Sequence, residues 1–355
     1  MIHLALAGIV IALATSAVVS LLLLLPCSAL AESVAVTAAR RGRIWLIGLV
    51  LPVIGGAAAA GWTLWTLRTE SPLLRDSWER RKHLCVRSFC QGADATWRAN
   101  AGGWAGAVLL VGGVAGMLAG AAGTERSRRR HRRAARVPSV AVCAALEDIP
   151  ARYRVAESRL GELALPERNS ACAGALRPEV FVTTGLVQAL PRDELAAVLA
   201  HEFSHACRHD NLLGLVARSC VILAAFMPSA VYFARRWGRD SELAADEWAY
   251  EALGRPEALV RAMATAAGAR QLAEPGRAAE LVAAVGGGEF AAERVLRLHA
   301  VMTADPEGPS GVPASVRRLA AVLATLGVLG VTVAAWDSVD ASLRCLGQSL
   351  LAALG

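Results

Sequence analysis

The sequence predicts a mainly α-helical membrane protein in which an α+β domain lies between the third and fourth transmembrane helices. Three observations predict this fold class. Hydrophobic residues make up 55% of the chain, and the mean hydropathy is positive. Charged residues make up only 19%, against roughly 25% in soluble domains. The apolar residues are also concentrated in long runs, which is typical of segments that cross a bilayer.

Four apolar runs are candidates for transmembrane helices, namely residues 4–25, 44–67, 102–123 and 319–336. Each is close to the roughly 20 residues that are needed to cross the hydrocarbon core. The first run has no positive charge at its amino end and is longer than the apolar core of a signal peptide, so an uncleaved anchor is favoured. The small residues Ser28, Ala29 and Ala31 leave a cleaved signal peptide as the alternative.

Basic residues beside these runs predict the orientation of the chain, because they accumulate on the cytoplasmic side. Arginines lie between the first two runs, directly after the third and directly before the fourth. All three groups are cytoplasmic if the amino terminus is outside. The loop at 68–101 is also basic, but it contains acidic residues and its positive charges are less dense. We therefore expect a multi-pass protein of the cell membrane with its amino terminus outside.

This topology divides the chain into four parts. A three-helix transmembrane region covers residues 1–123, with an outer loop at 68–101. A cytoplasmic domain covers 124–316, the fourth transmembrane helix covers 317–337, and a short extracellular tail covers 338–355. Cys85, Cys90 and Cys345 then lie outside the cell, where disulfides persist. A Cys85–Cys90 bridge, a bridge from either residue to Cys345, and unpaired thiols all remain open.

The formal net charge of +7 does not require a nucleic acid as partner. Basic residues beside apolar spans usually set topology, and the arginine run after the third span is suited to contact with anionic lipid headgroups. We therefore expect membrane lipids as a partner and no direct binding of nucleic acid.

The predicted cytoplasmic domain contains a short strand followed by a long helix. The strand is a β-branched run that Pro178 precedes and Gly185 ends; it consists of Val180, Phe181, Val182, Thr183 and Thr184. The helix begins near Pro191, with Asp193 and Glu194 facing the positive end of its dipole. From Leu195 onward the apolar residues have helical spacing.

This helix contains the sequence His201-Glu202-Phe203-Ser204-His205. Histidines four residues apart lie on the same face of a helix, so both imidazoles can reach one metal ion. Glu202 lies beside them and can take a proton from the attacking water and pass it to the leaving amine. The five-residue pattern also occurs by chance, so the prediction depends on a further ligand.

A second acidic segment with helical spacing supplies that ligand. Glu242 and Asp246 are four residues apart and share one face. Two histidines and one glutamate leave the fourth position of Zn²⁺ open for water, which is the arrangement of catalytic zinc sites. Asp246 is then placed to accept a hydrogen bond from a ligand imidazole. The alternative is a surface helix with solvated carboxylates. The sequence thus predicts one Zn²⁺ per chain, bound by His201, His205 and Glu242.

The residues around these motifs resemble the gluzincin membrane peptidases. The resemblance depends on residues 193–202, on His205, and on Arg208-His209-Asp210. Within this class, Gly174 and Pro178 before the strand are similar to the BlaR/MecR-type antirepressor peptidases, as are three spans before the peptidase domain and one after it. The heat-shock and CAAX-prenyl-protease group is the competing resemblance. In the antibiotic sensors a large penicillin-binding domain follows the last span, whereas about nineteen residues follow Trp336 here. We therefore expect no beta-lactam sensing through such a domain.

The resemblance implies further roles. The strand Val180–Thr184 would be an edge strand that pairs with an extended substrate peptide, and an ordinary buried strand is the alternative. Asp210 would support the zinc helix, either beside a ligand or in helix packing. Tyr232 and Tyr250 are candidate oxyanion donors. Residues 212–237 are apolar but interrupted, and they form a hairpin either against the membrane or within the soluble domain.

The sequence therefore predicts an integral-membrane zinc endopeptidase that hydrolyses peptide bonds in a cytoplasmic or membrane-proximal protein. By the resemblance, a DNA-binding repressor in a sensor–transducer pathway is a candidate substrate. One alternative is a housekeeping protease of the heat-shock/CAAX-protease type that degrades or processes membrane proteins. The other is a non-proteolytic signalling receptor with a vestigial zinc site. Glu202 argues against this last alternative, because a structural site needs no base.

Overall fold

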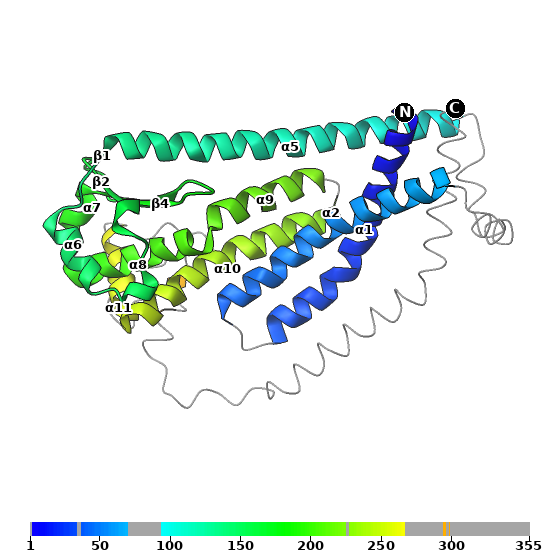
Figure 1. The fold of residues 1–355 in the computed structure, drawn as a ribbon. Helices are drawn as coiled ribbons and strands as arrows, with labels where there is room; N and C mark the ends of the chain where they lie inside the picture. The colour runs from blue at the N-terminus through cyan, green and yellow to red at the C-terminus, as the bar shows by residue number, and fades with distance from the viewer. Residues whose placement is uncertain are drawn as a thin grey trace.

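Long helices form an elongated bundle, and a small α+β domain lies at one end of it in the computed structural model (Figure 1). The structure describes residues 2–33, 37–69, 94–224, 227–266, 294, 295 and 298. The amino terminus lies at the end of the bundle that is far from the α+β domain (Figure 1).

The first three predicted spans lie within α1 (Ile2–Ser33), α2 (Ala38–Thr69) and α5 (Asp94–Ala134). α1 packs along α2, and the two backbones approach closely at Gly56, where a Cβ atom would lie 2.3 Å from the carbonyl oxygen of Ala12. α5 continues as a helix past residue 123, the predicted end of the transmembrane region, and includes most of the arginine run. This run is therefore a helical extension that joins the bundle to the α+β domain.

By length and apolar composition, one segment among the described residues is suited to cross a membrane, Ala38–Ala58 in α2. A shorter apolar helical segment, Thr15–Ala31, lies in α1. The predicted fourth span and the predicted tail lie outside the described residues, as do Cys85, Cys90 and Cys345. Four spans and their orientation therefore stay a prediction.

The α+β domain contains a four-stranded mixed sheet with the strand order β1-β2-β4-β3. The strands are β1 (Ala135–Arg136), β2 (Leu160–Leu163), β3 (Ser170–Ala173) and β4 (Glu179–Thr183). β4 is parallel to β2 and antiparallel to β3. The predicted strand is therefore present, but the edge-strand prediction is wrong. β4 has a neighbour on each side and is fully buried, because its apolar run packs into the core. Thr184 already begins the next helix.

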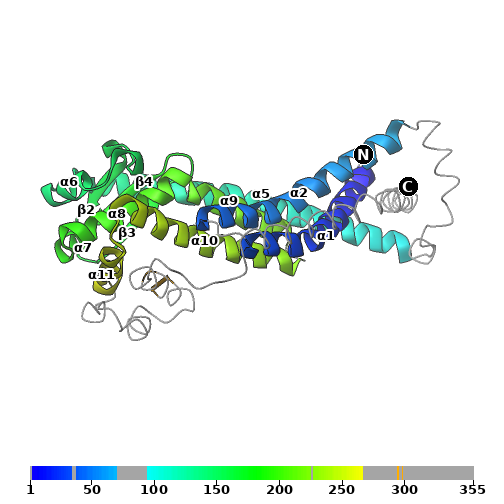
Figure 2. The same cartoon turned by 90° about the horizontal axis from the view of Figure 1, so that it is seen from below.

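Helices cover the sheet and complete the core of the domain (Figure 2). Two short ones, α6 (Val140–Glu147) and α7 (Thr184–Ala189), flank the strands. α8 (Arg192–Arg208) packs on β3 and β4, and α11 (Pro256–Ala266) packs on α8. Phe203 and Leu199 of α8 are completely buried among strand and helix residues. The helix with the histidine pair is thus anchored by its apolar face.

α9 (Asp210–Leu223) and α10 (Pro228–Leu253) form a hairpin that lies along the long helices (Figures 1 and 2). Glycines of α5 allow α9 to approach: a Cβ atom at Gly113 would lie 2.7 Å from Leu223 Cγ, and one at Gly120 would lie 2.6 Å from Leu215 Cδ2. Small residues that let backbones approach closely are typical of helix interfaces in membranes. The structure has the hairpin along the predicted transmembrane helices, and contact of the hairpin with the membrane stays a prediction.

The amino end of α2 is bound to the middle of α10. Trp45 Nε1 donates to Asp240 Oδ2 at 2.8 Å, and Arg41 donates to Oδ1 of the same carboxylate at 3.0 Å. The backbone N–H of Ala38 donates to Glu247 Oε2 at 2.7 Å. Asp240 and Glu247 lie on either side of the predicted metal ligand on α10. A helix of the bundle therefore fixes the part of α10 that belongs to the site.

Candidate metal centre

α8 presents His201 and His205 on one face, one turn apart, as their spacing predicts. The helix ends at His209, which has a left-handed backbone conformation with φ 55° and is exposed. This sharp turn starts α9 at once and brings Asp210 back beside the second histidine. His205 Nδ1 lies 2.7 Å from Asp210 Oδ2. His209 itself is not part of the site.

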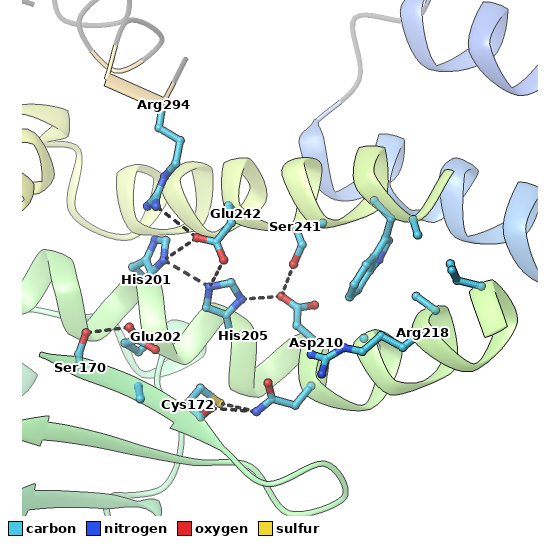
Figure 3. Close-up of a pocket in the computed structure, with 18 of the residues that line it drawn as sticks. Ser170, Cys172, His201, Glu202, His205, Asp210, Arg218, Ser241, Glu242 and Arg294 are labelled. Atoms are coloured by element: carbon cyan, nitrogen blue, oxygen red, sulfur yellow. Dashed lines mark hydrogen bonds and ion pairs between the residues drawn. The ribbon is translucent and has the colours of Figure 1, made fainter. Parts of the chain in front are cut away.

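The two histidines and Glu242 of α10 form a group of three metal-ligand side chains (Figure 3). His201 Nε2 and His205 Nε2 are 3.3 Å apart, and Glu242 carboxylate oxygens lie 3.6 Å from each of these nitrogens. Tetrahedral zinc with bonds of about 2.0–2.1 Å to nitrogen requires ligand atoms roughly 3.3–3.4 Å apart. The donor atoms therefore converge at distances that suit one tetrahedral ion.

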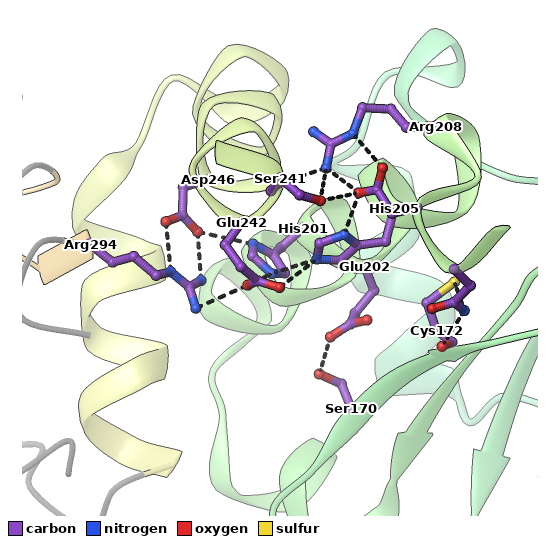
Figure 4. Close-up of polar contacts among 12 residues, drawn as sticks. Ser170, Cys172, His201, Glu202, His205, Arg208, Ser241, Glu242, Asp246 and Arg294 are labelled. Carbon is purple, nitrogen blue, oxygen red and sulfur yellow. Dashed lines mark hydrogen bonds and ion pairs between the residues drawn. The ribbon is translucent and has the colours of Figure 1, made fainter. Parts of the chain in front are cut away.

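The other nitrogen of each imidazole faces an aspartate. Asp246 Oδ1 lies 3.0 Å from His201 Nδ1, as the sequence predicts, and Asp210 lies beside His205 Nδ1. Asp210 is held in turn by Ser241 Oγ, which donates to it at 2.8 Å, and by the guanidinium of Arg208 (Figure 4). Carboxylates in these positions fix the tautomer that leaves Nε2 available to a metal.

The charges around the histidines favour a cation. Burial opposes the charged form of His201, but the carboxylates of Asp246 and Glu242 outweigh it and raise the pKa of this imidazole to about 9. Burial also opposes the charged forms of Glu242 and Asp246, yet contact with His201 and the charge of Arg294 lower the pKa of both carboxyls to about 2. The carboxylates thus attract positive charge to the imidazoles, and a metal ion can replace the proton.

Arg294 belongs to the site although no sequence pattern singles it out. Its Nε and Nη2 donate to the two oxygens of Asp246 at 2.9 and 2.7 Å, and Nη1 lies 3.3 Å from Glu242 Oε2 (Figure 4). Such a bidentate pair fixes the orientation of a carboxylate as well as adding energy. Arg294 therefore connects the residue that orients His201 with the third ligand.

Glu202 lies in the same cavity, next to the edge of the sheet. Ser170 Oγ, at the start of β3, donates to Glu202 Oε1 at 2.8 Å (Figure 3). This serine is a second residue that the sequence does not reveal, because a lone serine 32 positions before the motif has no distinguishing spacing. The contact orients the predicted base.

The free edge of the described sheet beside the site is β3. The carbonyl of Asn169 accepts from the N–H of Thr183 at 3.0 Å. The backbone groups of Asn169 therefore point toward β4. Because the hydrogen-bonding direction alternates along a strand of an antiparallel pair, the backbone groups of the next residue, Ser170, and of Cys172 point away from β4. Asn211 Nδ2 donates to the Cys172 carbonyl at 2.9 Å, which agrees with this direction. The edge next to Glu202 therefore belongs to β3.

A cavity of about 850 Å³ contains the site (Figure 3). It is lined by His201, Glu202, His205, Asp210, Glu242 and Arg294, by the first three residues of β3, and by the facing sides of α9 and α10. The strand residues Val180, Phe181, Val182, Thr183 and Thr184 do not line it, and neither do Tyr232 and Tyr250. Tyr250 is exposed, and Tyr232 packs against Trp45 at the bundle. Neither tyrosine lies where an oxyanion donor is needed.

The fold and the site together define a metallopeptidase type of domain. Comparison with known families agrees: residues 163–326 match the model of peptidase family M48. The matched segment contains both ligand-bearing helices and extends into the predicted fourth span. This segment of the chain is therefore similar to peptidases of that family. The hydrophobic core of the α+β domain begins earlier in the chain than this match, because residues of α6 and β2 belong to the same core as those of α8.

Curated relatives support the same family. A protease HtpX homolog of Pyrococcus furiosus is 33% identical over 101 residues, which are 25% of this chain and 34% of that protein. Protease HtpX homologs of Trichormus variabilis and of a Nostoc species are each 39% identical over 67 residues, which are 18% of this chain and 23% of those proteins. The chain thus matches about a third or less of each relative's length. No solved structure matches the chain.

The comparisons therefore support the gluzincin class but not the specific resemblance to the BlaR/MecR-type peptidases. The HtpX homologs favour the heat-shock group, which the sequence places second.

Proposed function

We propose that this chain is an integral-membrane zinc endopeptidase that cleaves protein substrates next to the membrane. The observation that supports this most strongly is the convergence of His201 Nε2, His205 Nε2 and the Glu242 carboxylate in one cavity with Glu202. The distances between the donor atoms, and the aspartate behind each imidazole, suit Zn²⁺ with one coordination position open. A structural site is usually closed by four protein ligands.

The chain's own residues divide the chemistry between them. When bound, zinc supplies a Lewis acid that polarises the peptide carbonyl and lowers the pKa of water. Glu202 accepts the proton of the attacking water and returns it to the leaving amine. Ser170 holds Glu202 Oε1 at 2.8 Å and so limits the orientations of the base. Asp210 and Asp246 keep the imidazoles in place while the proton moves.

The substrate is expected to bind as an added strand along β3. This corrects the assignment of that role to residues 180–184, of which 180–183 lie in the buried β4 and Thr184 begins α7. The outward backbone groups of Ser170 and the backbone N–H of Cys172 offer hydrogen bonds to an extended peptide, and Ser170 also contacts Glu202. A peptide on this edge therefore runs past the base and the metal ligands.

A housekeeping role on membrane proteins is the favoured biological function, because the matched relatives are named protease HtpX homologs. The antirepressor function, with a DNA-binding repressor as substrate, stays a prediction from the sequence. The arrangement of α9 and α10 against α2 and α5 supports a site close to the membrane. Contact with lipids and a cytoplasmic location of the domain are parts of this proposal.

The test compares wild type with Glu202→Gln in membranes. The expected result is that both forms bind equal amounts of zinc and that only wild type generates new protein fragments, identified by their new termini in mass spectrometry. His209→Asn is a matched control, since this exposed residue lies outside the site and asparagine tolerates its left-handed backbone conformation. Identical fragments from wild type and Glu202→Gln, with zinc present in both, contradict peptidase activity and support the receptor alternative.

A further inference from the structure

The cavity at the metal centre continues between α9 and α10, and this part contains a cation without an acidic partner. Arg218 of α9 lines it together with apolar side chains, namely Ala217, Val221, Ile222, Ala234 and Trp237 (Figure 3). Arg208 and Arg294, the other arginines near the site, are paired with Asp210 and Asp246. Among the described residues, no carboxylate lies within ion-pairing distance of Arg218. Arg218 is exposed at this end of the cavity, so its guanidinium is accessible to a carboxylate that enters the groove.

The guanidinium of Arg218 reaches back toward the metal centre. A Cβ atom at Gly214, one turn earlier on α9, would lie 3.9 Å from Arg218 Nη2 and 3.4 Å from the ring of Trp237. Gly214 is one turn after Asp210, which is about 6 Å along the helix axis. Asp210 in turn contacts His205. An extended peptide advances about 3.3 Å per residue, so the guanidinium is roughly two to four residues from a peptide bond at the metal centre.

We propose that Arg218 is a specificity-determining residue that binds a carboxylate of the substrate, at roughly two to four residues from the cleaved bond. The carboxylate belongs to an aspartate or glutamate side chain or to the carboxyl terminus of the substrate. Arginine binds carboxylates with two parallel hydrogen bonds, and the apolar walls of the groove lie beside the guanidinium. The same walls accept apolar side chains on either side of the acidic one. This inference rests on the proposed peptidase function.

The experiment uses the purified full chain in lipid nanodiscs with a series of quenched-fluorescent decapeptides. The peptides are built from alanine, leucine and phenylalanine, and one glutamate is moved through every position; matched series contain glutamine or lysine instead. A further pair has a free or an amidated carboxyl terminus. Mass spectrometry locates each cleaved bond. For wild type we expect glutamate at one position, two to four residues from the cut, to raise kcat/KM by about tenfold over glutamine.

Variants at Arg218 identify the cause of this preference. Arg218→Lys should keep the preference for glutamate, Arg218→Gln should abolish it, and Arg218→Glu should change it to lysine. Each variant should still cleave the glutamine series, which shows that it is folded. Arg235→Glu is the matched control, because Arg235 is an exposed arginine of the same hairpin that does not line the cavity. It should keep the wild-type preference.

Two results overturn the inference in different ways. If all variants retain the wild-type order of substrates, Arg218 contacts lipid or solvent and does not select the substrate. If wild type cleaves no peptide faster than Glu202→Gln does, the proposed peptidase function itself fails, and the specificity role fails with it. A dependence on the free carboxyl terminus rather than on an internal glutamate identifies the terminal carboxylate as the group that is bound.

Discussion

The contact between Asp246 and His201 predicts that Asp246→Asn weakens zinc binding. Asp246 is almost fully buried, lies 3.0 Å from His201 Nδ1, and receives two hydrogen bonds from Arg294 at 2.7 and 2.9 Å. The substitution keeps the shape of the side chain but removes the charge that both partners require. Arg294 is then left with its charge next to the ligand Glu242.

The expected magnitude follows from the role of such partners. Loss of a group that orients a metal-bound histidine typically reduces metal affinity 10–100-fold, which is about 1.4–2.7 kcal/mol. We expect Asp246→Asn to lie at the upper end of this range, because the same carboxylate also neutralises a buried arginine. Asp210→Asn should cause a smaller loss, because Arg208 keeps its hydrogen bond to the carbonyl of Ser241 and Asp210 is less buried than Asp246.

Competition with a zinc-binding dye at fixed pH measures this difference on the purified full chain. Asp193→Asn is a suitable control, because Asp193 lies on the helix of His201, is paired with Arg261 at 2.9 Å, and does not line the cavity. It should bind zinc as wild type does. If Asp246→Asn binds zinc within twofold of wild type while its thermal unfolding is unchanged, the contact with His201 does not support the metal site and the reasoning is refuted.

Three further predictions concern the base and the packing of the bundle. Ser170→Ala should lower kcat by about tenfold with unchanged zinc content, because Glu202 loses its hydrogen bond; an unchanged kcat would argue against this role. Trp45→Phe should lower stability by about 1.5–3 kcal/mol, because Asp240 loses a donor inside the protein; thermal unfolding measures this. Gly56→Ala should destabilise the chain by about 1–3 kcal/mol, because the new methyl group clashes with Ala12, whereas Gly55→Ala should leave the stability unchanged. Equal unfolding midpoints of these two variants would contradict the close packing of α1 and α2.

The sequence predicts those parts of the site that lie at fixed spacings within one helix. His201 and His205 share a face of α8, and Glu242 and Asp246 share a face of α10, because helical periodicity alone determines both relations. Asp210 is also at the expected place, since the turn at His209 follows directly from the end of α8. The strand before α8 is present within one residue of its predicted bounds.

The remaining features depend on tertiary contacts that no local pattern specifies. Arg294 reaches Asp246 across 48 positions, and Ser170 reaches Glu202 from the edge of the sheet. The position of β4 inside the sheet depends on which strands flank it, and a short β-branched run is equally suited to an edge or an interior position. The position of Arg218 could not be predicted from the sequence either. Its sequence neighbours indicate only an apolar helix with an interruption, and the packing of α9 against α10 places Arg218 in the cavity.

X-ray absorption at the zinc edge of the purified full chain tests the proposed metal centre most directly. We predict one zinc per chain with two imidazole nitrogens at about 2.0–2.1 Å, at least one carboxylate oxygen and no sulfur ligand. In Glu242→Gln the spectrum should change or the zinc should be lost. Absence of zinc from wild type, or a zinc–sulfur distance of about 2.3 Å that indicates Cys172 in the same cavity, would contradict it.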